Sequence, residues 1–118
     1  MPEPIKPNAP ELPSEEVRHR VDVSSLDHDE VIAEFTASDC FPPSRVLRGI
    51  SVSTGRLQRV NLAESGFDGG HFTDLDLEDC DLANVRCRRA NLTRVRFRGG
   101  RLTGLALLDS ALYDIVFE

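Results

Sequence analysis

Apolar residues recur at every fifth position over most of this chain. From Leu47 to Phe117, fifteen consecutive positions spaced five residues apart are all apolar. A second series, two residues before each of these centres, is mostly small or aliphatic, and the other three positions are largely polar. An α-helix would repeat about every 3.6 residues and a β-strand about every 2, so neither element alone explains the period.

A period of five indicates a backbone that turns a corner once in every unit. A straight strand would place successive centres on opposite faces, and a helix would spread them around its whole surface. Four sides of five residues close a square coil of about twenty residues, and such coils stack about 4.8 Å apart. The pattern therefore predicts an all-β solenoid over residues 45–118, with about 3.5 coils.

The charged residues support this coil length, because residues twenty apart would stack on one side of the solenoid. Three columns alternate in sign: Arg56–Asp76–Arg96, Asp74–Arg94–Asp114 and Glu78–Arg98–Glu118. Four single pairs are also of opposite sign: Arg59 with Asp79, Asp68 with Arg88, Asp81 with Arg101, and Arg89 with Asp109. We therefore expect ion pairs between neighbouring coils, each contributing about 0–1 kcal/mol where it is exposed.

Several units resemble the five-residue repeat of the pentapeptide repeat family, A-(D/N)-L-x-x: VNLAE (60–64), CDLAN (80–84) and ANLTR (90–94). The resemblance covers about residues 45–118 and implies a right-handed quadrilateral parallel β-helix, with the central and minus-two side chains inside. The chain departs from the pattern where a small minus-two residue is usual, at Leu75, Leu105 and Ile115. Gly55 stacks beside Leu75 in this register and is expected to make room for it.

The N-terminal part of the chain does not follow the repeat in an obvious way. Residues 1–16 hold five of the seven prolines, which predicts a disordered tail. Residues 17–44 are then expected to cap the solenoid. Val17, Val21 and Val23 alternate with polar residues, which favours a short edge or capping strand.

Residues 24–40 allow two interpretations. Asp27 followed by Glu30 resembles a capping box, and Val31, Ile32 and Phe35 would form the apolar side of a short helix. Alternatively, AEFTA and SDCFP are two early five-residue units. The helix is slightly favoured, and the segment FPPS (41–44) is expected to end whatever precedes it.

Composition excludes several classes of protein. The net charge is −6, which argues against a nucleic-acid binder held by phosphate contacts. No apolar run approaches the roughly 20 residues of a transmembrane helix. The three cysteines are an odd number without a CxxC pair, so we expect a reduced, cytoplasmic protein.

No residue pattern indicates catalysis, a metal site or a cofactor. Cys80 and Cys87 fall on inward positions and are expected to fill the core. The acidic run 74–81 lacks the glycine and glutamate spacing of an EF-hand. In the basic run 86–98 the one aromatic residue, Phe97, points inward, so stacking on bases is not expected. The sequence therefore predicts a protein that is not an enzyme.

Two functions fit a solenoid of this kind. One is a protein-interaction or scaffold module whose partner the sequence does not identify. The other follows from the family resemblance, because quinolone-resistance and gyrase-inhibiting members are rod-like dimers whose acidic faces imitate B-DNA. Residues 55–118 carry a net charge of only −1, and arginines interrupt each acidic column. This distribution favours the scaffold over a topoisomerase-binding DNA mimic.

The last coil carries the candidate self-association surface. Leu108, Tyr113 and Val116 fall on outward positions of successive sides, and Phe117 is the last centre. An apolar band at the end of a rod is a surface that native repeat proteins usually cover. We expect a homodimer through this coil, and the alternative is a fragment of a longer solenoid whose further coils cover it.

Overall fold

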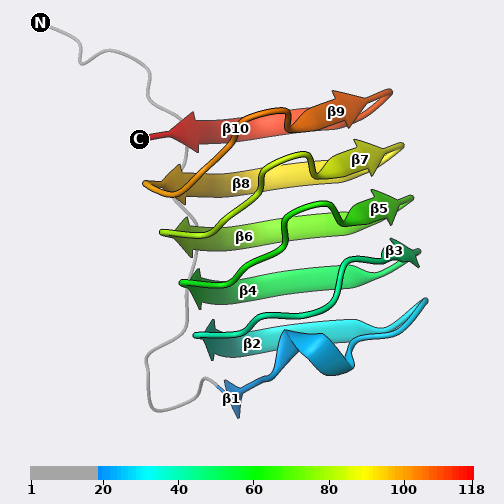
Figure 1. The fold of residues 1–118 in the computed structure, drawn as a ribbon. Coiled ribbons are helices and arrows are strands. Elements are labelled where there is room, and N and C mark those ends of the chain that lie inside the picture. The colour runs from blue at the N-terminus through cyan, green and yellow to red at the C-terminus, as the bar shows by residue number, and fades with distance from the viewer. Residues whose placement is uncertain (1–18) are drawn as a thin grey trace, which may run out of the picture.

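The structure, a computed structural model, describes residues 19–118. Ten strands of this part form two parallel sheets, accompanied by a 3₁₀-helix, η2 (Val23–Ser25). The six-stranded sheet contains, in spatial order, β1 (His19–Arg20), β2 (Val31–Ser38), β4 (Ser51–Gln58), β6 (His71–Glu78), β8 (Asn91–Arg98) and β10 (Ala111–Phe117). The four-stranded sheet contains β3 (Val46–Arg48), β5 (Gly66–Asp68), β7 (Arg86–Arg88) and β9 (Ala106–Leu108). Both sets of strands stack in one direction (Figure 1).

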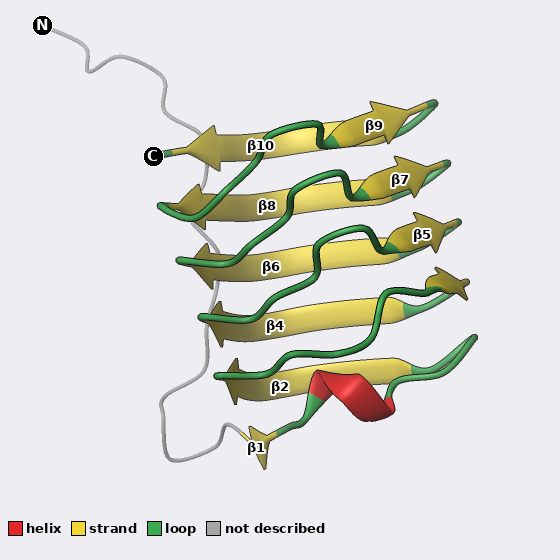
Figure 2. Cartoon of the chain, in the orientation of Figure 1, coloured by secondary structure: helices red, strands yellow, loops and turns green. Residues whose placement is uncertain are grey.

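Neighbouring coils are offset by twenty residues. Ser51 of β4 pairs with His71 of β6, and His71 pairs with Asn91 of β8. The short strands keep the same offset, since Gly66 pairs with Arg86. Long strands form one layer, and the short strands with their connecting turns complete each coil (Figure 2). The predicted all-β solenoid and its twenty-residue coil are confirmed.

A residue with positive φ stands at each corner of the coil. Asp74 (φ 55), Asp79 (φ 54), Asn84 (φ 58) and Arg89 (φ 51) are four successive corners spaced five residues apart. Residues other than glycine rarely adopt positive φ, and among them Asp and Asn tolerate it best. Four corners in each coil give the cross-section the four sides that the period of five predicts.

The interior contains both inward series, as predicted. Leu75, Cys80 and Val85 of the minus-two series are at most 4% exposed, and the centres Leu82 and Cys87 are also buried. Each large side chain that is fully buried stabilises the fold by about 1.5–3 kcal/mol. Core packing between stacked coils therefore supplies most of the stability.

The prediction that the solenoid begins at residue 45, after a helix in 24–40, is wrong. Val31–Ser38 is strand β2, which pairs along its length with β4 at the same offset of twenty residues. The alternative of early five-residue units is correct, and Phe35 occupies the minus-two series opposite Gly55. Stacking on β4 decides the conformation, because β2 gains a full set of ladder hydrogen bonds there.

The capping-box residues close a turn instead of starting a helix. Glu30 Oε1 accepts a hydrogen bond from the Asp27 backbone N–H at 3.1 Å, which is half of a capping box. The 3₁₀-helix lies earlier in the chain, and Asp22 caps it by accepting from the Ser24 N–H. A hydrogen bond between a side chain and a nearby backbone N–H, such as that of Glu30 with Asp27, therefore forms in a turn as well as at the start of a helix.

The prediction that the segment FPPS (41–44) ends the preceding element is wrong. Strand β2 ends at Ser38, the position at which β4, β6 and β8 also end in their coils, and the solenoid continues beyond FPPS. In the next coil the Leu62 N–H donates to the Asp81 carbonyl oxygen at 2.8 Å. Pro42, twenty residues before Leu62, has no N–H to donate. The bridges between Asn61, Asp81 and Arg101 on this side of the coil therefore do not extend to the first coil.

The N-terminal cap is shorter than predicted. Strand β1 pairs with β2 through His19 and Arg20, and the chain then enters η2. Val23 and Leu26 are buried against the first coil, so this segment covers that end of the core. Val17 and the predicted disordered tail, residues 1–16, lie outside the described residues.

Gly55 makes room for a different residue from the one expected. A Cβ atom at Gly55 would lie 2.3 Å from Cε1 of Phe35, the residue in the coil before it. Phe35 is fully buried, so the ring occupies the space that a side chain at position 55 would need. Leu75 pairs with Gly55 on its other side, in the next coil.

Candidate functional site

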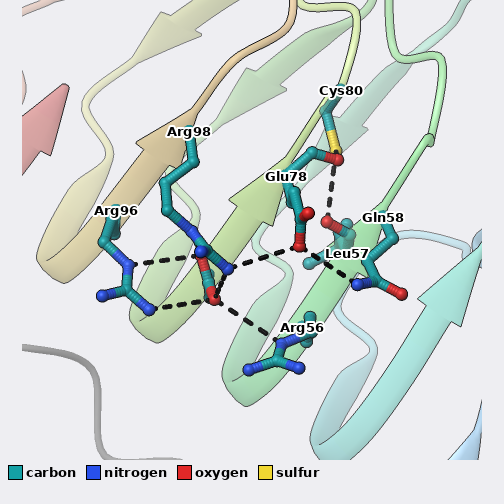
Figure 3. A network of polar contacts seen from close by, with 8 residues as sticks. Arg56, Leu57, Gln58, Glu78, Cys80, Arg96 and Arg98 are labelled. Atoms are coloured by element: carbon teal, nitrogen blue, oxygen red, sulfur yellow. Dashed lines mark hydrogen bonds and ion pairs between the residues drawn. The ribbon is translucent and has the colours of Figure 1, made fainter. Parts of the chain in front are cut away.

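The most densely connected polar cluster lies on the outer face of β4, β6 and β8, around Asp76. The sheet register places Asp76 between Arg56 and Arg96, twenty residues to either side. Arg96 Nη2 lies 3.1 Å and Arg56 Nε 3.5 Å from Asp76 Oδ2. The Asp76 side chain has no solvent-exposed surface and contacts Arg56, Arg96 and Arg98. Figure 3 shows these three arginines on neighbouring strands.

Arg98 extends this cluster to the neighbouring column. It donates from Nη2 to Asp76 Oδ2 at 2.7 Å and from Nε to Asp76 Oδ1 at 3.0 Å, which is a two-point contact. The same Nη2 donates to Glu78 Oε2 at 3.3 Å. Gln58 Nε2 donates to the same oxygen at 3.1 Å. Three coils are thus joined by hydrogen bonds on one face, and three arginines neutralise two carboxylates.

The pKa of Asp76 is lowered. Burial by itself raises the pKa, but the hydrogen bonds from Arg96 and Arg98 outweigh it, and the charges of both arginines act in the same direction. A carboxyl group held as an anion at a buried position depends on these arginines. The cluster therefore fixes the register of the coils, and the buried carboxylate has no free oxygen for a ligand.

This shift predicts a specific pH dependence of stability. A lowered folded-state pKa means that Asp76 stabilises the fold above its ordinary value of 3.8 and loses this contribution as pH falls through the folded value. We expect the difference in unfolding free energy between the wild type and Asp76→Asn to be constant near neutral pH and to shrink below pH 3.8. Urea unfolding at a series of pH values measures it. A difference that grows on acidification would contradict the assignment.

Two other predicted ion pairs are present. Arg94 Nε lies 2.6 Å from Asp74 Oδ1, and Arg101 Nη1 lies 3.5 Å from Asp81 Oδ2. Both join residues twenty apart, as expected. These arginines remain exposed by 30% and 69% of their side chains, so their contribution is about 0–1 kcal/mol each.

Three predicted pairs are replaced by others. Arg59 contacts Asp39 at 2.7 Å instead of Asp79, since the solenoid extends one coil further toward the N-terminus than predicted. Arg89 contacts Asp68 at 2.8 Å, which replaces both Asp68–Arg88 and Arg89–Asp109. Arg89 stands at a corner, from which its long side chain reaches diagonally to the preceding coil. Asp68 accepts from both Nε and Nη2 of Arg89, and Arg88 is left without this partner.

The cysteines and histidines form no reactive site. Burial raises the pKa of Cys80 and of Cys87 to about 11, so both stay protonated and unreactive near neutral pH. The side chain of His71 hydrogen-bonds Asn91, twenty residues away, at 3.2 Å. Within residues 19–118, no three His, Cys, Asp or Glu side chains gather in a way that could hold a metal ion.

An open groove follows the outer face of the short strands. Its volume is about 610 Å³, and it passes over β5 and β7 between Val46 at one end and Leu108 at the other. Gly66 leaves a gap between Val46 and Arg86 in the same column. The sequence reasoning missed this groove, although the column Val46–Gly66–Arg86 is visible once the coil length is known.

Comparison with known proteins identifies the repeat. The family model described as pentapeptide repeats matches residues 71–104 in eight copies. This chain contains pentapeptide repeats. The solenoid also matches the crystal structure of Rfr23, a pentapeptide repeat protein of the cyanobacterium Cyanothece 51142, with a TM-score of 0.68 and 24% identity. That match covers 75% of this chain and 60% of Rfr23. No curated protein matches the sequence.

The matched repeats agree with the predicted five-residue unit over residues 71–104, and the structural match confirms the predicted fold. The coils continue beyond the matched segment in both directions, since β2 and β10 keep the offset of twenty residues. Pentapeptide repeat proteins are generally not enzymes. In the described part, no helix is long and apolar enough to cross a membrane.

The candidate self-association surface lies beyond the matched repeats. Leu108, Tyr113 and Phe117 are 44%, 63% and 54% exposed. Val116 is half-buried beside Arg96, its partner in β8. Phe117 is a centre whose ring stacks on Phe97, with ring centroids 5.0 Å apart, and its other face is open. The sequence did not predict the exposure of Leu112, the preceding centre, which is 43% exposed.

Proposed function

We propose that this chain is a non-enzymatic protein-interaction or scaffold module. The observation that supports it is the regular outer surface, in which side chains twenty residues apart stand in columns that are held in register by backbone ladders and by the Asp76 cluster. A stack of this kind presents an extended, rigid surface to a partner. The three free thiols fit the reducing conditions of the cytoplasm, where we place the protein.

Capture of a partner protein tests this function. Tagged wild-type protein is used to recover partners from a lysate of the source organism, and the recovered proteins are quantified by mass spectrometry. The matched control is the same chain with polar substitutions on the outward face of one side at a time. A stoichiometric partner that is lost with one face supports the module, and recovery of nothing above background refutes it.

The DNA-mimic alternative receives less support from the charges. A mimic needs a continuous acidic strip, whereas Asp76 is buried beneath Arg56 and Arg96, and Glu78 is paired with Arg98. Gyrase supercoiling in the presence of micromolar protein distinguishes the two functions. We expect no strong inhibition, and inhibition that disappears when Asp76, Glu78 and Asp79 are neutralised together would favour the mimic.

We also propose that two copies associate through the last coil. Three apolar side chains, Leu108, Tyr113 and Phe117, are exposed there, and Val116 lies beside them. Burying side chains of this size contributes about 1.5–3 kcal/mol each, from which the cost of association is subtracted. The remaining free energy of association is sufficient for a dimer at moderate protein concentration.

Sedimentation of a charged variant checks this association. We expect the wild type to sediment as a dimer and the triple variant Leu108→Glu, Tyr113→Lys, Val116→Lys to sediment as a monomer, because charges would be forced into the contact. Variants of Ser53 and Thr73, which lie in coils further from the last one, are the control. A wild type that remains monomeric at high concentration would refute the dimer.

A further inference from the structure

The groove over the short strands is lined by two arginines that, in the described part of the chain, lack the ion pairs formed by the arginines of the long strands. Arg86 and Arg88 of β7 are exposed on its wall. Within residues 19–118, neither forms an ion pair or a side-chain hydrogen bond, whereas the arginines of β4 and β8 contact carboxylates. The groove therefore offers two guanidinium groups to a ligand.

The acidic residues of the groove are engaged elsewhere. Asp68 accepts from Arg89 at 2.8 and 2.9 Å, and this contact removes the partner that Arg88 would have in its own column. Glu64 stands at the corner of the coil, where its carboxylate accepts from Asn84 Nδ2 at 2.9 Å. The lining residues thus include two arginines and two carboxylates, but each carboxylate accepts its hydrogen bonds from a residue other than Arg86 or Arg88. A carboxylate that enters the groove can therefore pair with the two guanidinium groups.

Both ends of the groove are apolar. Val46 is 56% exposed at the first coil, and Leu108 is 44% exposed at the last. The two residues belong to coils three steps apart, which at about 4.8 Å per step corresponds to about 14 Å. An extended peptide covers this distance with about four or five residues, since each residue spans about 3.3 Å.

We propose that this groove binds an extended acidic segment of a partner protein. Carboxylates in the middle of the segment contact Arg86 and Arg88, and apolar side chains at its two ends lie against Val46 and Leu108. Gly66 adds no side chain to the groove, and a large side chain there would crowd Val46, whose Cγ2 lies 3.2 Å from the place of a Cβ atom at position 66. This inference rests on the proposed function, for which it specifies the surface and the chemistry of the partner.

A peptide fits the groove better than a nucleic acid does. Guanidinium groups form two-point contacts with carboxylates as well as with phosphates. The single aromatic residue that lines the groove, Phe67, is half-buried on an inward position, so it offers no exposed ring for stacking bases.

Binding of a short synthetic peptide tests the groove. The probe is fluorescein-labelled LTEETL, and its neutral analogue LTQQTL is the matched peptide. Fluorescence anisotropy on the full chain should show that the acidic peptide binds about tenfold more tightly than the neutral one, and that Arg86→Gln/Arg88→Gln removes this difference. The matched protein control is Arg59→Gln/Arg101→Gln, which changes the net charge equally at two exposed arginines on other sides and should bind as the wild type does.

A second variant tests the shape of the groove without changing its charge. Gly66→Gln should fill the gap beside Arg86 and weaken peptide binding by about tenfold as well. Circular dichroism checks that each variant is folded. Amide NMR shifts of the wild type on adding LTEETL should be largest at Gly66 and Gly104. Leu108 belongs both to the groove and to the proposed dimer surface, so binding is measured at a protein concentration at which sedimentation shows one species.

Several results would overturn the proposal. One is that Arg59→Gln/Arg101→Gln weakens binding of LTEETL as much as Arg86→Gln/Arg88→Gln does. Another is that the amide NMR shifts are confined to another face of the solenoid. A third is that a thymidine hexanucleotide binds as tightly as LTEETL. Absence of binding at about 1 mM peptide would also refute it. If lysate capture still succeeds in that case, the scaffold function stands and only the groove is wrong.

Discussion

Replacing Asp76 with asparagine is expected to lower the free energy of unfolding by about 3 kcal/mol. The change removes the negative charge on which Arg56, Arg96 and Arg98 converge and preserves the shape of the side chain. Breaking a buried ion pair leaves uncompensated charge, which typically costs about 3–5 kcal/mol. We expect the low end of this range, because each arginine retains between 26% and 33% of its side-chain exposure and can turn toward water.

Asp68→Asn is the matched control for this measurement. Asp68 also pairs with an arginine, but Arg89 is 66% exposed and Asp68 is 28% exposed. Loss of a surface pair costs about 0–1 kcal/mol. Urea unfolding followed by circular dichroism compares the two variants near neutral pH. If Asp76→Asn loses no more stability than Asp68→Asn, the cluster does not hold the coils together.

The period of five was sufficient to predict the fold. Leu82 and Cys87 are unremarkable apolar residues one at a time, and only their regular spacing over many units excludes helices and simple strands. The offset of twenty residues then follows from geometry, and pairs such as Arg94–Asp74 agree with it. Long-range order was readable here because each coil repeats the contacts of the one before it.

The first coil was missed because its inward residues are atypical. Phe35 stands where small residues usually stand, and Pro42 occupies a centre. The corner series contains a signal that would have located this coil. Asp29 (φ 60) and Asp39 (φ 54) continue the series of Asp, Asn and Gly that turns the chain at Asp74, Asp79 and Asn84. Residues that tolerate positive φ therefore mark many corners of the solenoid even where the apolar pattern is interrupted, although corners such as Glu34, Thr54 and Arg59 carry no such signal.

Side-chain partners on the surface were less predictable than the register. A spacing of twenty identifies residues in the same column, but long arginine side chains can also reach across a corner. Arg89 contacts Asp68, twenty-one residues away, and Arg98 contacts Asp76, twenty-two residues away. Because Asp68 pairs diagonally with Arg89, Arg88 is left without an ion pair among the described residues of the groove. The spacing of twenty residues instead pairs Arg88 with Asp68, so the sequence did not reveal the unpaired arginine.

Gly55→Ala is expected to lower the free energy of unfolding by about 3 kcal/mol, the upper end of the usual cost of overpacking. The new Cβ atom would lie 2.3, 2.5 and 2.6 Å from three atoms of the Phe35 ring. Phe35 is fully buried between the N-terminal cap and β4, so the ring can move only within the core, where it lines an apolar cavity of about 100 Å³. The smaller entropy of the unfolded alanine variant offsets only about 0.4–1 kcal/mol of this cost.

A double-mutant cycle separates this collision from other effects of alanine. Phe35→Ala alone should cost about 3–5 kcal/mol, because it empties a buried site. In the double variant the methyl group of Ala at position 55 meets no ring, so the double variant should be no less stable than Phe35→Ala. The resulting coupling energy is about 3 kcal/mol, at the upper end of values for residues in contact.

Gly66→Ala is the control for the cycle. Its new Cβ atom would lie 3.2 Å from Cγ2 of Val46, and Val46 is 56% exposed and free to move outward. We expect a change within about 0.5 kcal/mol, as for most surface substitutions. Urea unfolding of the four variants and the wild type provides all the values. Equal losses in Gly55→Ala and Gly66→Ala, or costs of Gly55→Ala and Phe35→Ala that simply add, would show that Phe35 does not occupy the space beside Gly55.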